Sequence, residues 1–67
     1  MIRIVVNGEP REFGDEATVA VLVEALDLLP EQVAVEVNRE LVPRAQRSST
    51  QLQDGDRVEL VTLVGGG

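Results

Sequence analysis

Apolar and polar residues alternate along several short segments of the chain, which predicts a sheet of short strands. The first segment, 2–6, places its apolar side chains on one face and runs into Asn7-Gly8, a strong signal for a tight hairpin. Segment 9–13 returns along it, and Pro10 cannot donate a hydrogen bond to a neighbouring strand, so we expect an edge strand there. Phe13, the single aromatic residue, is expected to pack in the core.

Between Thr18 and Pro30 the apolar spacing changes to that of an amphipathic helix. Thr18 is suited to cap the first turn, and Pro30 ends the pattern. The apolar positions at the spacing i, i+3, i+4 and i+7 are Val19, Leu22, Val23 and Leu26. They predict one helix of about ten residues, a typical length for a small domain. Its apolar stripe is needed to cover the sheet.

The second half of the chain returns to alternation. We expect a strand at 32–37 with its valines inward, followed by a turn at 38–40 and a short strand at 41–44. A polar connection at 45–53 has room for one helical turn. A tight turn at 54–56 then leads into a final strand at 57–63. A hairpin followed by a crossover helix favours a mixed sheet packed on that helix, with the last strand beside the first. We therefore predict an α+β, β-grasp (ubiquitin-like) fold with four to five strands in residues 1–64.

The final strand is apolar on both of its faces, because Val58 and Leu60 fall opposite Val61 and Leu63. One helix can cover only one face of the sheet. We therefore predict that Val61 and Leu63, with Val5, form an exposed apolar surface that a partner covers.

The sequence ends in three glycines, Gly65, Gly66 and Gly67, directly after this apolar run. Glycine loses more entropy on ordering than any other residue, so residues 65–67 are predicted to form a flexible tail. Without side chains, such a tail can enter a narrow channel in a partner and present the carboxylate of Gly67. A substrate tail that an enzyme activates is one interpretation, and a frayed chain end is the other.

Composition and charge exclude several classes of function. The 67 residues are 43 % apolar, enough for one domain with a small core. No apolar run approaches the ~20 residues that cross a bilayer, and no signal-peptide pattern begins the sequence, so we expect a soluble, cytoplasmic protein. A formal charge of −6 argues against nucleic acid and anionic membranes as partners and favours basic proteins.

The side chains that most catalytic mechanisms require are missing. There is no His, Cys, Lys, Tyr or Trp, and most nucleophilic and general acid–base devices use at least one of them. The carboxylates are scattered and show no metal-ligand spacing. The sequence therefore predicts a protein that is not an enzyme and binds neither a metal nor a cofactor of its own.

Several segments, in their order and spacing, resemble the ThiS family, the small sulfur carriers of thiamine biosynthesis. They are Asn7-Gly8-Glu9, residues 37–44 (Val-Asn-Arg-Glu-Leu-Val-Pro-Arg), residues 53–56 (Gln-Asp-Gly-Asp) and the terminal Gly66-Gly67. The resemblance covers nearly the whole chain. One position departs from it, because Arg47 stands in a loop where many members of the family have an aromatic residue.

The resemblance implies a sulfur-carrying role for Gly67. Its carboxylate would be adenylated by an E1-like, ATP-dependent activating enzyme (ThiF) and converted to a thiocarboxylate with sulfur from a donor such as a cysteine desulfurase. The thiocarboxylate would then give its sulfur to thiazole synthase (ThiG). Gly65 and Gly66 would present the tail, and Val61, Leu63 and Val64 would seat it. ATP would be used by the activating partner.

Two alternatives stay open. A MoaD-like carrier for molybdopterin synthesis shares the fold, the tail and the activation chemistry, although those chains are usually longer and approach the diglycine through proline-rich or aromatic segments. The other alternative is a β-grasp interaction module whose tail carries no chemistry.

Overall fold

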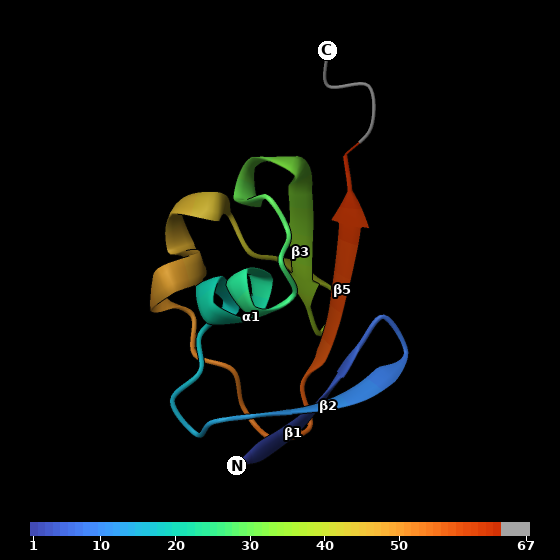
Figure 1. The fold of residues 1–67 in the computed structure, drawn as a ribbon, viewed down its shortest axis with the longest axis vertical. Coiled ribbons are helices and arrows are strands. Elements are labelled where there is room, and N and C mark those ends of the chain that lie inside the picture. Colours follow the sequence, from blue (N-terminus) through green and yellow to red (C-terminus); the bar gives the residue numbers. More distant parts are fainter. Residues whose placement is uncertain (64–67) are drawn as a thin grey trace.

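The computed structural model describes residues 1–63, and the main element of this part of the chain is a mixed five-stranded sheet (Figure 1). In chain order the elements are β1 (Ile2–Val6), β2 (Glu9–Phe13), α1 (Val19–Ala25), the 3₁₀ helix η1 (Pro30–Gln32), β3 (Val33–Val37), β4 (Glu40–Leu41), the 3₁₀ helix η2 (Arg44–Ser49) and β5 (Arg57–Thr62). The strand order is β2-β1-β5-β3-β4, with β1 and β5 parallel and the other pairs antiparallel. This is the predicted β-grasp, ubiquitin-like fold, with the last strand beside the first.

The β1–β2 hairpin forms at the predicted turn. Asn7 and Gly8 have φ values of 50° and 83°, and positive values at both central residues are what a type I′ turn requires. The register then places Pro10 opposite Val5, in the edge strand β2. Pro10 is tolerated there because one side of an edge strand has no ladder to join.

Helix α1 begins at the predicted cap but ends early. The Oγ1 atom of Thr18 accepts a hydrogen bond from the backbone N–H of Val21 at 3.3 Å. The helix stops at Ala25, so the predicted length of about ten residues is wrong. Asp27 adopts a left-handed φ of 59°, and its N–H bonds to a carbonyl three residues back at 3.0 Å. This closing turn, normally built with glycine, ends the helix before the apolar pattern does.

The core lies between α1 and one face of the sheet. Its buried residues are Ile2, Ile4, Val6, Ala17, Val19, Leu22, Val23, Val33, Val35, Val42, Leu52 and Val58. Phe13 and Val37 pack against them, as predicted. Segment 45–53, predicted to be a polar connection, contains η2 and contributes Leu52 and Arg47 to the interior. The short strand predicted at 41–44 is β4, which covers only Glu40–Leu41. Pro43 is the residue directly before η2.

Figure 1 shows α1 and both 3₁₀ helices on the same side of the sheet, and the other side carries no helix of the described residues. None of the helices in residues 1–63 is long and apolar enough to span a membrane.

Candidate functional site

The carboxyl end of β5 extends beyond its neighbour β1. The β1 pairing covers Arg57 and Val58, whereas the β3 pairing continues to Thr62, opposite Val33. One residue further, the N–H of Leu63 bonds to the carbonyl of Gln32 at 2.8 Å. Figure 1 shows this end of β5 rising past the β1–β2 hairpin. The strand end that leads to the predicted tail is therefore held along β3.

Asn7 holds the other edge of β5 where β1 ends. Its Oδ1 atom accepts a hydrogen bond from the N–H of Leu60 at 2.8 Å, and its Nδ2 atom donates to the carbonyl of Leu60 at 3.2 Å. The backbone N–H of Asn7 bonds to Val58 at 2.9 Å. Beyond the last β1–β5 pair, the side-chain amide of Asn7 thus makes the hydrogen bonds to β5 that a further residue of β1 would make. The sequence pattern identified Asn7 as a turn residue and missed this second role.

The start of β5 is fixed in a similar way. Oδ1 of Asn38 accepts from the N–H of Arg57 at 3.0 Å, and its Nδ2 atom donates to the carboxylate of Asp56 at 3.0 Å. The carboxylate of Asp54 accepts from the backbone N–H of Arg3 at 2.7 Å, which ties the predicted 54–56 turn to β1. The start and the middle of β5 are therefore positioned by side chains of neighbouring turns.

The two faces of β5 have different surroundings. Val58 is 1 % exposed and Leu60 packs against the core, whereas Val61 and Leu63 are 56 % and 53 % exposed on the other face. The predicted exposure of Val61 and Leu63 is confirmed. Val5 is half-buried, so it offers less of this surface than was predicted.

The outward face, meaning the side of the sheet away from α1, contains further residues that the sequence analysis missed. Ala34 lies directly opposite Val61, and Leu41, opposite Glu36, is 64 % exposed. Opposite residues of an antiparallel pair share a face, so both extend the apolar surface across β3 to β4. Glu36 also faces Glu59 across the β3–β5 pair. Arg57 lies on the same face, two residues before Glu59, and both line a shallow hollow with Arg39. The outward face therefore carries charges of both signs beside its apolar residues.

The residues predicted to carry and present the modification are Gly65, Gly66 and Gly67, and Val64 was assigned to the partner-binding surface. All four lie outside the described residues. Their roles stay predictions. Among residues 1–63, no three acidic side chains converge in a way that could hold a metal ion.

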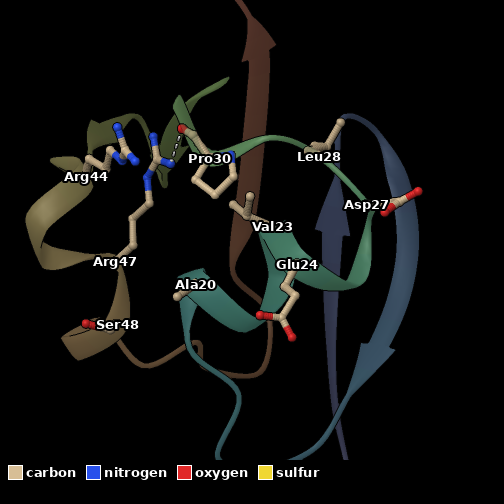
Figure 2. A pocket seen from close by; sticks show the side chains of 9 residues that line it. All are labelled: Ala20, Val23, Glu24, Asp27, Leu28, Pro30, Arg44, Arg47 and Ser48. Carbon is tan, nitrogen blue, oxygen red and sulfur yellow. Dashed lines mark hydrogen bonds between the residues drawn. The ribbon is translucent and has the colours of Figure 1, made fainter. Parts of the chain in front are cut away.

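On the helix side, a hollow of about 420 Å³ lies between α1 and η2 (Figure 2). Its lining consists of Ala20, Val23, Glu24, Asp27, Leu28, Pro30, Arg44, Arg47 and Ser48. Arg44 is exposed at the rim, 3.8 Å from Glu31, whereas Arg47 is buried. In the sequence, Arg47 stands out only as a departure from a family pattern. Its burial and its bonds to two backbone carbonyls were not expected from a residue in a polar segment.

Comparison with known proteins identifies the family. Residues 4–67 match the family model described as the ThiS family. The chain belongs to the ThiS family. A crystal structure of the thiamine biosynthesis protein ThiS from Geobacter metallireducens superimposes with a TM-score of 0.84 at 35 % identity, covering 98 % of this chain and 100 % of that one.

Two relatives of this ThiS-family chain differ greatly in length. The sulfur carrier protein ThiS of Escherichia coli is 32 % identical over 66 residues, which cover 98 % of this chain and all of that protein. A thiazole synthase of Paramagnetospirillum magneticum is 39 % identical over 66 residues, again 98 % of this chain. The chain spans only 20 % of the length of that thiazole synthase.

Proposed function

We propose that this ThiS-family protein carries sulfur as a thiocarboxylate on Gly67 and donates it for thiazole formation in thiamine biosynthesis. The observation that carries the proposal is the family match, which continues through the glycine tail to residue 67. The full-length alignment with a protein named as a sulfur carrier supports it.

The chemistry needs nothing from the carrier except its terminal carboxylate. A carboxylate oxygen attacks the α-phosphorus of ATP on an activating enzyme, pyrophosphate leaves, and an acyl adenylate forms. A persulfide sulfur of the donor then attacks the acyl carbon and expels AMP. A second thiol attacks the donor's sulfur of the resulting acyl disulfide, forms a new disulfide with the donor and releases the thiocarboxylate. A chain without Cys, His or Lys can serve in this sequence because it acts as a substrate rather than a catalyst.

The outward face supplies the surface on which an activating enzyme would dock. Val61 and Leu63 closely precede the glycine tail in the sequence, and each is more than half exposed. Val5 and Val64 are assigned to the same surface, and Leu41 extends it. Exposed apolar side chains on a chain of net charge −6 suit a partner with an apolar patch and basic residues around it.

The proposed partners are an E1-like activating enzyme (ThiF), a sulfur donor such as a cysteine desulfurase, and thiazole synthase (ThiG). The last is supported by the thiazole synthase relative, a fifth of whose length aligns with this chain. A protein that physically includes such a segment is the natural acceptor for its sulfur.

The test is intact-mass spectrometry of the protein after incubation with ATP, the ThiF-like enzyme of the same organism and a sulfur source. We expect an adenylate on Gly67, followed by the mass increase of one sulfur replacing one oxygen. The matched control is the chain lacking Gly65, Gly66 and Gly67, which keeps Val61 and Leu63 of the outward face, has no terminal glycine and should stay unmodified. An unchanged mass for the intact chain, with a known carrier modified in parallel, would contradict the proposal and favour an interaction module with an inert tail.

A further inference from the structure

Arg47 of η2 is the one charged side chain buried within the described residues, with 7 % of its surface exposed. Its Nη1 atom donates to the carbonyl of Pro30 at 2.9 Å, the bond drawn in Figure 2, and its Nη2 atom donates to the carbonyl of Val33 at 2.6 Å. No carboxylate within residues 1–63 pairs with it, and its Nε atom has no partner there. A buried charge without a counter-ion is costly unless hydrogen bonds compensate it, so the two carbonyls that Arg47 binds are its main compensation.

The two backbone carbonyls explain what the side chain does. On the β4 side of β3, the carbonyl of Val35 accepts from the N–H of Val42 at 2.9 Å. Alternate residues of a strand bond to the same neighbour, so the carbonyl of Val33 is the next acceptor on that edge. Because β4 spans only two residues, no strand reaches that acceptor. The guanidinium of Arg47 takes the place of the missing strand.

The opposite edge of the same β3 segment holds the end of β5. Val33 lies opposite Thr62, and the carbonyl of Gln32 accepts from the N–H of Leu63. The two carbonyls that Arg47 binds, those of Pro30 and Val33, stand on either side of Gln32 in the chain. Arg47 therefore restrains the backbone segment to which the last described residue of the chain is bonded.

We propose that Arg47 is a positioning residue for the carrier tail. By holding η1 and the first residue of β3 in place, it fixes the backbone position of Leu63, the last described residue before the segment that carries Gly67. The inference rests on the proposed function, since the position of Leu63 matters for sulfur transfer only if Gly67 must reach an active site.

The test compares Arg47→Met and Arg47→Lys with Arg44→Met, a matched change in the same 3₁₀ helix at an exposed arginine. Arg44 touches η1 only through a solvent-exposed ion pair with Glu31 at 3.8 Å, and such pairs contribute little to stability. Backbone amide exchange, followed by NMR, reports each hydrogen bond separately. In Arg47→Met we expect the Leu63 amide to exchange about tenfold faster, because two charge-assisted bonds to its acceptor segment are gone. The amides of Val5 and Asn7, which bond to Asp56 and Val58 at the other end of β5, should exchange as in the unmodified chain.

Lysine sharpens the comparison, because its single ammonium group cannot reach both carbonyls as a planar fork does. Arg47→Lys should therefore accelerate Leu63 exchange to an intermediate extent, and Arg44→Met should leave it unchanged. In steady-state adenylation by the ThiF-like enzyme, Arg47→Met should raise KM for the carrier about fivefold with kcat unchanged, since a less ordered exit adds an entropy cost to docking.

Unchanged Leu63 exchange in a folded Arg47→Met protein would overturn the inference and leave Arg47 as a space-filling residue. Equal acceleration at Leu63, Val5 and Asn7 would also overturn it, because it would indicate a loss of global stability. A failure of the proposed function has a different signature. In that case the unmodified chain is not adenylated at all, while the exchange experiment still decides whether Arg47 holds the end of β5.

Discussion

Both faces of β5 carry apolar side chains, but only one of the two faces belongs to the core. Val58 and Leu60 face α1 and belong to the core, whereas Val61 and Leu63 face away from every helix of the described residues and are more than half exposed. The difference arises from the number of covering elements, since one helix can pack on only one side of a sheet. Apolar residues on the uncovered side contribute little to folding and remain available to a partner.

The strongest way to separate the two faces is an aspartate on the inward one. Val58→Asp places a carboxylate at a position that is 1 % exposed, with no partner prepared for it. Burying it unpaired costs about 4 kcal/mol or more, and a domain of this size has only about 5 kcal/mol of stability. We expect loss of the folded β-sheet signal in circular dichroism at 25 °C. A cooperative thermal transition close to that of the unmodified chain would show that the inward face is not essential.

The same substitution on the outward face should spare the fold. Val61→Asp changes an exposed strand residue, which costs less than about 1 kcal/mol. Under the proposed function it weakens binding to the ThiF-like enzyme about tenfold or more, because a desolvated carboxylate replaces an apolar contact. Isothermal titration calorimetry measures the affinity, and circular dichroism checks the fold.

The control for Val61→Asp is Leu29→Asp, because Leu29 is also 56 % exposed and directly precedes η1, a helix on the side of the sheet opposite the outward face (Figure 1). It should bind as the unmodified chain does. If Val61→Asp unfolded the protein, Val61 would belong to the core. If both variants bound equally weakly, general charge rather than the outward face would explain the loss.

The sequence predicted the features that depend on neighbours along the chain. Alternation predicted the strands, Asn7-Gly8 predicted a turn that needs positive φ, and the uneven count of helices and sheet faces predicted the exposure of Val61. It failed where a residue adopts a conformation that its type does not favour. Asp27 ends α1 in the left-handed region usually occupied by glycine, so the apolar pattern overestimated the helix.

It also failed where a side chain replaces a missing strand. Asn7 bonds to β5 past the end of β1, and Arg47 bonds to β3 past the end of β4. Both roles depend on how far a neighbouring strand extends, and strand ends are set by tertiary packing rather than by local pattern. An arginine in a predicted loop is expected at the surface, and only the three-dimensional structure shows that Arg47 is buried.

The next prediction tests whether the Asn7 side chain holds the edge of β5 beyond the end of β1. Asn7→Gly keeps the positive φ that the turn requires and removes both bonds to Leu60. We expect a loss of about 1 kcal/mol in the free energy of unfolding and faster amide exchange at Leu60. Chemical denaturation and NMR exchange measure the two effects. Asn7→Asp retains the acceptor oxygen for the Leu60 N–H. Its free energy of unfolding and its Leu60 exchange rate should lie between those of the unmodified chain and Asn7→Gly. Unchanged exchange at Leu60 would assign Asn7 to the turn alone.

The smallest expected effect concerns the charge on the outward face. Glu36 and Glu59 face one another across β3 and β5 beside the apolar residues, within a chain of net charge −6. Opposite charge steers association, and salt screens it over about 8 Å at physiological ionic strength. We expect the association rate with the ThiF-like enzyme to fall about threefold between low and physiological salt, with a weaker dependence for Glu59→Gln. Stopped-flow fluorescence at several salt concentrations measures it. Salt-independent rates would leave docking to Val61 and Leu63 alone, and the outward face would then act through its apolar residues without electrostatic steering.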